Sequence, residues 1–498
     1  MNIHRAKTQI KNAISAYLTK NEYGEPIISM ERQRPVFLMG PPGIGKTAVM
    51  AQISAELNIG LIAYSMTHHT RQSALGLPFI SHKIYEGKEY NISEYTMSEI
   101  IASVYDLMEK TGVKSGILFL DEINCVSETL APVMLQFLQY KIFGKHKIPD
   151  NWILVAAGNP PEYNKSVREF DIVTWDRLKR IDIEPDFNAW KEFAYEQGVH
   201  PAVLTYLEIK KSDFYSVEST VNGKTFVTAR GWCDLSDIIK IYEKQKIAVD
   251  SELIIQYLQK PGTAKSFSVY YDLFNKYRAD YQADKILAGK TDAEIKARAA
   301  NAGFDERLAL IGLLLDSVTE DMRETLESDE VSKKLLGVLK TVAAAGETGG
   351  NIGRAIKNQI ETLNRFSETG KISASISDTD RYIIKRVAAI LDSMGGVKEF
   401  TECGGFYNHE IETNKKNAAA AGEKLKNLFV FCEETFTKEE LSIVAAEITV
   451  NRISSNFIAR YGSKEYFRLN KSLMLSERGL EITAEIKTLE DQLFIKKG

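Results

Sequence analysis

Five short apolar runs, separated by stretches with helical periodicity, dominate residues 35–185 and limit the folds open to this chain. Each run is too short for a typical helix and has the apolar composition of a buried strand. Strands that alternate with helices in this way are typical of a parallel sheet covered by helices on both faces. The runs are VFLM, LIAYS, GILFL, WILVAA and the more polar RIDIE. The sequence therefore predicts an α/β core over residues 34–185.

Helical patterns lie on both sides of this core. Residues 1–33 hold one amphipathic helix followed by a turn-rich stretch. Residues 186–276 contain mostly amphipathic helices, with a hairpin signal at Asn222-Gly223. We expect the second of these regions to form a small α-helical lid.

The C-terminal residues 277–498 are rich in Ala, Lys, Glu and Leu at helical spacing, as in FDERLALIGLLLDSV. Glycines gather at 346–353 and at 404–405, and such clusters predict loops or helix breaks. We expect a large, mostly α-helical C-terminal domain, to which the sequence assigns no role.

Composition narrows the class of protein. The 498 residues contain 63 basic and 67 acidic side chains, a formal net charge of -4, and no polybasic tail, so nucleic acid is not an expected partner. The four cysteines form no CxxC pair and lie far apart, which fits packing residues in a reducing compartment. No apolar run approaches the roughly 20 residues that span a bilayer. We expect a cytoplasmic protein with no membrane partner.

The segment GPPGIGKT fits the pattern GxxxxGK[ST] and lies between the apolar run VFLM and the helical stretch TAVMAQISAEL. Its glycines let successive N–H groups point at a phosphate, and the helix that follows adds its positive end. We expect Lys46 to bridge the β- and γ-phosphates of ATP and Thr47 to place its hydroxyl on Mg²⁺. A tight glycine turn without a ligand is the alternative. The predicted ATP-binding residues are Gly40, Pro41, Pro42, Gly43, Ile44, Gly45, Lys46, Thr47 and Ala48.

An acidic pair, Asp121 and Glu122, follows the apolar run GILFL. Ligands bind at the carboxyl ends of the strands in sheets of this kind. We assign Asp121, together with Thr47, to Mg²⁺, which prefers oxygen ligands. We assign Glu122 to the attacking water, because successive side chains along a strand point in different directions. A helix cap or a surface pair is the alternative for these carboxylates.

With these motifs in place, residues 30–275 resemble the MoxR-like family of AAA+ ATPases. In the run WILVAAGNP, Asn159 matches the polar residue that AAA+ proteins place between the acidic pair and the γ-phosphate. The resemblance implies that this side-chain amide orients the attacking water and senses the phosphate. On its own, an asparagine before two prolines is also a common turn former.

Two arginines gain roles from the same resemblance. Asp176-Arg177-Leu178 is similar to the DRF segment, whose arginine acts on the ATP of a neighbouring subunit, although Leu178 replaces the usual aromatic residue. Arg168 and Arg180 are close enough in the sequence to compete with Arg177 for this role. Arg230, in the segment TARGW of the lid, looks like the second sensor, which reaches back to the γ-phosphate.

The resemblance extends to two insertions. Residues 139–152 read as a hairpin, and residues 67–95 form a longer insertion rich in Gly, Ser, His and Tyr. Both positions match insertions of MoxR-like proteins, where they line a central pore or contact partners.

The resulting prediction is a chaperone-like ATPase that hydrolyses Mg-ATP at the subunit interfaces of a ring and remodels or activates a partner protein. The resemblance implies a hexamer and a client or von Willebrand A-domain partner. Two alternatives stay open, namely a nucleotide-gated scaffold with little turnover and a nucleic-acid-associated AAA+ motor.

Overall fold

The chain forms two compact units. The computed structural model describes residues 1–472, except 165, 221–222, 348–350 and 398. Unit 1 comprises residues 1–190, 215–231 and 334–403, and unit 2 comprises residues 191–214, 232–333 and the described residues from 404 onward. The division at residues 33, 185 and 276 stays a prediction, because contacts instead group three separate stretches of chain in each unit.

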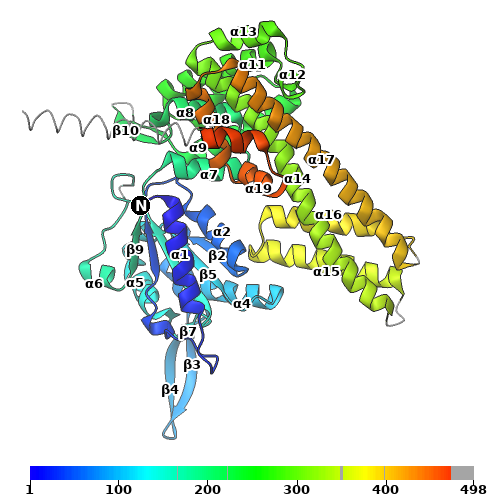
Figure 1. The fold of residues 1–498 in the computed structure, drawn as a ribbon. Helices are drawn as coiled ribbons and strands as arrows, with labels where there is room; N and C mark the ends of the chain where they lie inside the picture. Colours follow the sequence, from blue (N-terminus) through cyan, green and yellow to red (C-terminus); the bar gives the residue numbers. More distant parts are fainter. Residues whose placement is uncertain (165, 221–222, 348–350, 398, 473–498) are drawn as a thin grey trace, which may run out of the picture. The chain divides into compact units, whose positions relative to one another are not determined.

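Unit 1 is built on a five-stranded parallel sheet with the order β2-β5-β8-β1-β9 (Figure 1). The strands are β1 (Val36–Met39), β2 (Gly60–Ser65), β5 (Gly116–Asp121), β8 (Trp152–Gly158) and β9 (Lys179–Asp182). The five apolar runs of the sequence form these strands, so the predicted α/β core is confirmed. β5 and β8 are buried on both faces, which explains why their sequences are continuously apolar.

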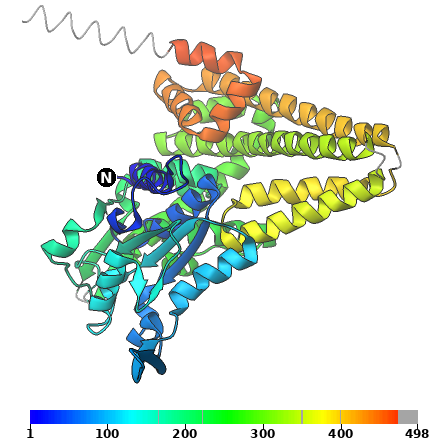
Figure 2. The same cartoon turned by 90° about the horizontal axis from the view of Figure 1, so that it is seen from below.

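Alternate residues of these strands belong to two hydrophobic cores, one on each face of the sheet. Leu38 and Phe119 share a core with α1 and α2, whereas Phe37 and Leu118 share a core with α4 and α5. The four helices are α1 (Ile3–Leu18), α2 (Lys46–Leu57), α4 (Glu99–Thr111) and α5 (Ala131–Tyr140). The sheet is thus the middle of three layers (Figures 1 and 2).

Three hairpins belong to the described part of unit 1. They are β3 (Pro78–Tyr85) with β4 (Lys88–Tyr95), β6 (Ile142–Phe143) with β7 (His146–Lys147), and β10 (Ser216–Thr220) with β11 (Gly223–Val227). The last two confirm the hairpins expected in 139–152 and near Asn222-Gly223, although residues 221–222 lie outside the described residues. The β3–β4 hairpin was not predicted, because most of its side chains are exposed on both faces and no polar-apolar alternation marks it.

A helical hairpin from the C-terminal region also belongs to unit 1. It consists of α15 (Ile352–Ser373) and α16 (Asp378–Ser393), which pack on each other. α15 packs against α4 and the edge strand β2. Ser54 of α2 donates a hydrogen bond to the carbonyl of Ala374, at 3.0 Å. The C-terminal region therefore contacts the far end of the helix that begins at Lys46.

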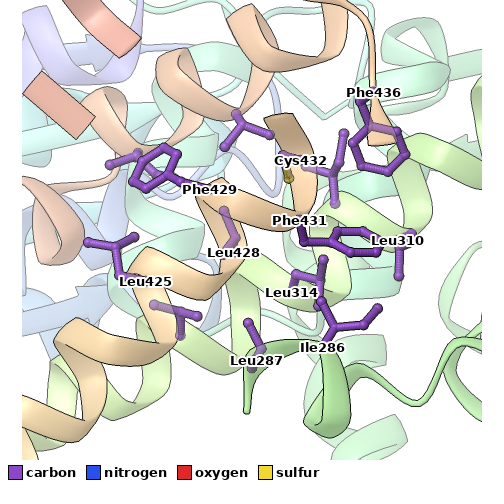
Figure 3. Packing of buried hydrophobic residues seen from close by; sticks show 14 of the residues in the cluster. Ile286, Leu287, Leu310, Leu314, Leu425, Leu428, Phe429, Phe431, Cys432 and Phe436 are labelled. Atoms are coloured by element: carbon purple, nitrogen blue, oxygen red, sulfur yellow. The ribbon is translucent and has the colours of Figure 1, made fainter. Parts of the chain in front are cut away.

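Unit 2 is helical, and the buried residues of its core come from the C-terminal region, from Tyr281 to Leu469. Phe431 of α17 (Phe400–Thr435) lies near Leu310 and Leu314 of α14 (Phe304–Glu347) in this core (Figure 3). Its helices include α8 (Pro201–Ile209), α10 (Ser251–Tyr257), α11 (Pro261–Tyr281), α12 (Ala283–Leu287), α13 (Ala293–Asn301), α18 (Lys438–Val450) and α19 (Arg452–Tyr461). The large helical C-terminal region is confirmed.

Four helices contribute residues to both units, namely α7 (Phe187–Glu196), α9 (Ala229–Gln245), α14 (Phe304–Glu347) and α17 (Phe400–Thr435). The helix break expected at Gly404-Gly405 is wrong, because α17 runs through both glycines. Each glycine costs a helix roughly 1 kcal/mol relative to alanine, a penalty that packing along a long helix can offset. In the other glycine cluster, residues 348–350 lie outside the described residues.

The remaining elements are short. They are η1 (Met30–Arg32), η2 (Met66–His68), α3 (Arg71–Leu75), η3 (Ile123–Cys125), α6 (Ile172–Asp176) and η4 (Lys211–Asp213). None of the helices in the described ranges is both long and apolar enough to cross a membrane. All four cysteines are free thiols.

Candidate functional site

The phosphate loop, Gly40–Thr47, connects β1 to α2, and α2 begins at Lys46. Gly43 and Gly45 have φ angles of 73° and 96°, in the left-handed region that favours glycine. A Cβ on Gly43 would also lie 2.8 Å from the side chain of Thr228. Both the turn and the close approach of Thr228 therefore require glycine in this loop.

The Lys46 side chain is buried beneath the loop. Its Nζ donates to the carbonyls of Gly40 and Pro41, at 2.7 and 3.0 Å, and to Asn159 Oδ1 at 2.8 Å. Burial lowers the pKa of Lys46 to about 8, although the carboxylates of Asp121 and Glu122 act in the opposite direction. The ammonium is thus held by neutral oxygens and poorly solvated, so it would gain from an anion.

Thr47 and Asp121 offer oxygen ligands from two neighbouring elements. The Thr47 hydroxyl donates to Asp121 Oδ2 at 3.1 Å. A hydroxyl and a carboxylate side by side at the edge of a sheet fit Mg²⁺, which binds few protein oxygens and keeps several waters. Within the described residues, no group of three or more His, Cys, Asp or Glu side chains could hold another metal ion.

Glu122 lies just beyond the end of β5, with a φ angle of 56°. Its Oε2 accepts hydrogen bonds from Ser65 Oγ at 3.1 Å and from Thr67 Oγ1 at 3.3 Å. A left-handed turn, and not the expected alternation along a strand, therefore separates the direction of Glu122 from that of Asp121. The sequence analysis also missed Ser65 and Thr67, whose only signal is that hydroxyls lie at and just after the end of the edge strand.

Asn159 directly follows β8, and Asn124 holds its backbone. Asn124 Nδ2 donates to the Asn159 carbonyl at 2.8 Å, and its Oδ1 accepts from the Asn159 N–H at 3.3 Å. Asn124 is buried, and a Cβ on Gly158 would lie 2.5 Å from its amide. Asn124 was not predicted from the sequence, although its position two residues after Glu122 could have indicated a role at the site.

Residues of the lid segment that belong to unit 1 contact the phosphate loop. The Arg230 N–H donates to the Gly43 carbonyl at 3.0 Å, and the Tyr215 hydroxyl donates to the Pro42 carbonyl at 2.8 Å. The Arg230 guanidinium is exposed, and in the described part of the chain it has no hydrogen bond or ion pair. Its charge nevertheless acts on Lys46. Arg230 is therefore close to the loop and available to a ligand. Tyr215 was not predicted from the sequence, because no motif marks it.

The three candidate arginines lie apart from the phosphate loop of their own chain. Arg177 is exposed at the end of α6 and donates to Gln139 Oε1 at 2.5 Å. Arg168 pairs with Glu128 at 2.7 Å. Arg180 pairs with Asp182 and stacks over the Trp175 ring, with 4.6 Å from its Cζ to the ring centroid. Arg177 alone of the three has only a neutral partner among the described residues.

A comparison with known protein families agrees with the class that this geometry defines. Residues 35–178 match the family model described as an AAA domain of the dynein-related subfamily. Among solved structures, a mutant of RuvB from Thermotoga maritima aligns with 16% sequence identity and a TM-score of 0.27, over 51% of this chain and 69% of that one. No curated protein matches the chain.

The chain therefore contains an AAA+ ATPase domain, and nucleotide binding is a property of that class. The matched residues include the phosphate loop, the acidic pair and Asn159. They end at Leu178, before the lid and the C-terminal helices.

Proposed function

We propose that this chain hydrolyses Mg-ATP at the carboxyl edge of the unit 1 sheet and uses the reaction to remodel or activate a partner protein. One observation carries the enzymatic part of the proposal. The ends of β1, β5 and β8 bring Lys46 to 2.8 Å from Asn159, and Thr47 to 3.1 Å from Asp121. The groups that bind phosphate, accept a metal and orient water thus meet at one place.

The roles follow from the chemistry of each group. The γ-phosphate of ATP replaces the Gly40 and Pro41 carbonyls as the partner of Lys46, and phosphate oxygens are stronger acceptors for an ammonium. Bound Mg²⁺, held by Thr47 and Asp121, would neutralise charge on the phosphates.

The hydrolytic step belongs to Glu122 and Asn159. Water attacks the γ-phosphorus, the bond to the bridging oxygen breaks, and ADP and phosphate leave. Glu122 accepts a proton from the water once its carboxylate is free of Ser65 and Thr67. Asn159 orients the water through its side-chain amide.

A neighbouring subunit completes the site in this proposal. Arg177 is exposed, its side chain donates a hydrogen bond to Gln139, and it can extend to the ATP of another chain. Such an arginine stabilises the charge that develops during phosphoryl transfer. Following the resemblance to MoxR-like proteins, we propose a hexameric ring that acts on a client or on a von Willebrand A-domain protein.

Glu122→Gln tests the enzymatic part. The amide keeps the shape of the side chain but cannot accept the proton, so we expect turnover to fall by about 10²–10⁴-fold while ATP remains bound. Glu109→Gln, an exposed change on α4, is the matched control and should leave turnover unchanged. If Glu122→Gln keeps the wild-type rate, Glu122 is not the base, and a nucleotide-gated scaffold becomes the better description.

A further inference from the structure

Unit 2 contains a groove that ATP hydrolysis does not use. It lies between α7 and α8, on one side, and α14 and α18, on the other, and encloses about 50 Å³. All of its lining residues belong to unit 2. The groove therefore combines the beginning of the lid with helices of the C-terminal region.

A glycine sets the width of this groove. A Cβ on Gly312 of α14 would lie 2.1 Å from Thr205 of α8, so only glycine lets the two helices approach this closely. Asp316 follows one turn later on the same face of α14, which directs it toward the groove. The apolar part of the wall is formed by Val199, Leu204, Leu308, Ile311, Leu315 and Ile443.

The charges that line the groove do not balance, because four carboxylates face two cations. Lys191 pairs with Glu208 at 2.7 Å and also with Glu447. Arg323 pairs with Glu320 at 3.0 Å.

Asp316 is the remaining carboxylate. It makes no hydrogen bond or ion pair with any residue that the structure describes. The groove therefore carries an unmatched negative charge beside an apolar wall.

The neighbours of Asp316 act on its ionisation. Desolvation raises the pKa of Asp316 to about 6, and Glu320 acts in the same direction. His200, Arg323 and Lys240 act in the opposite direction without restoring the ordinary value. At neutral pH the carboxylate is ionised, and its side chain is exposed, so it is accessible to a cation that enters the groove.

We propose that the groove binds a lysine or arginine side chain of a partner polypeptide, with the charged group at Asp316 and the methylene stem on the apolar wall. Lys and Arg combine an apolar stem with a charged end. The volume favours a side chain over a whole small molecule, because small-molecule sites have roughly 300–1,000 Å³. This proposal is independent of ATP hydrolysis.

Saturation-transfer NMR on the intact chain without nucleotide tests the proposal. The probes are N-acetyl-lysine N-methylamide, its norleucine counterpart without the ammonium, and n-butylammonium as a free amine. The variants are Asp316→Asn and the control Glu324→Gln, which makes the same charge change on α14 outside the groove. Melting curves of each variant check that the fold is kept.

We expect the lysine probe to bind the wild type and Glu324→Gln with a similar, millimolar dissociation constant. Asp316→Asn should weaken it at least tenfold, and the norleucine probe should bind the wild type at least tenfold more weakly. Equal binding of the lysine and norleucine probes, no binding of the lysine probe, or no effect of Asp316→Asn would overturn the cation site. If n-butylammonium binds more tightly than the lysine probe, the groove binds free amines, and the proposal of a polypeptide side chain is wrong.

Discussion

The carboxyl edge of the unit 1 sheet and the groove of unit 2 use charged side chains in opposite ways. At the edge, Lys46 already contacts Asn159, and Thr47 already contacts Asp121. In the groove, Asp316 has no such partner among the described residues. A ligand at the edge must therefore displace existing hydrogen bonds, whereas a cation in the groove displaces only water.

This difference teaches what each region can do. Groups that pair with one another can exchange partners during a reaction cycle, and the energy of the old contacts is recovered when the product leaves. A carboxylate such as Asp316, which has no partner among the described residues, suits simple binding. Substitutions should therefore alter turnover at the edge and only affinity or stability at the groove.

The largest effect in this comparison is expected for Lys46→Met. Loss of the ammonium removes charge-assisted hydrogen bonds to phosphate, each worth roughly 1.5–3 kcal/mol, so ATP affinity should fall by about 100-fold or more. Calorimetric titration with ATP measures this. Lys110→Met, an exposed change on α4, should bind ATP as the wild type does, and a Lys46→Met chain with normal affinity would remove Lys46 from the site.

When ATP phosphates replace the loop carbonyls as partners of Lys46, the chain should take up protons. In the free chain its pKa is about 8, so at pH 8.5 most of the side chain is neutral. Bound phosphates raise this pKa, so ATP binding at pH 8.5 should take up a substantial fraction of a proton, and at pH 6.5 almost none from Lys46. Calorimetry in buffers of different ionisation enthalpy measures the uptake. If Lys46→Met takes up as many protons as the wild type on binding ATP at pH 8.5, this account is wrong.

A smaller effect is expected for Asn124→Ala. This change removes the two hydrogen bonds that hold the backbone of Asn159, so kcat should fall by roughly tenfold through poorer orientation of the water. Asn164→Ala is the control, because Asn164 contacts Cys125 and not Asn159. Steady-state kinetics at saturating ATP compares the two. A loss of affinity without a loss of kcat would assign Asn124 to folding of the loop instead.

The smallest effect concerns the stability of unit 2. Because the pKa of Asp316 is raised to about 6, above its ordinary value, its ionised form destabilises the folded state above pH 6, and this cost disappears as pH falls below the ordinary range. Because the side chain is exposed, solvent screens most of this cost, so Asp316→Asn should raise the melting temperature by at most about 1 °C at pH 7.5 and leave it unchanged at pH 3. A lower melting temperature at pH 7.5 would mean that Asp316 stabilises the fold.

Local patterns in the sequence predicted the edge site well. Uninterrupted apolar runs located β1, β5 and β8, and the spacing of the glycines located the phosphate loop. Parallel pairing then brings the strand ends together, so Lys46, Asp121 and Asn159 meet without any further information. These residues are adjacent to elements that short sequence windows define.

Features that depend on distant contacts were not predictable. The turn that directs Glu122 depends on a left-handed backbone conformation of a non-glycine residue, which no composition signal marks. Tyr215 reaches Pro42 across more than 170 residues of chain. The groove around Asp316 combines four helices, and its glycine, Gly312, looks in the sequence like a weak point of a helix.

The central claim is that Arg177 of one subunit completes the ATP site of its neighbour, and the ATPase rate as a function of protein concentration tests it most directly. The samples are the wild type, Arg177→Ala, and an equal mixture of Arg177→Ala with Glu122→Gln. The account predicts a wild-type specific activity that rises with assembly, measured by light scattering on the same samples. Arg177→Ala should assemble but lose about 10³-fold or more in rate. The mixture should recover activity, because each Glu122→Gln subunit supplies an intact Arg177 to its neighbour. A rate that is independent of concentration in a monomer, or Arg177→Ala with wild-type activity, would contradict the account.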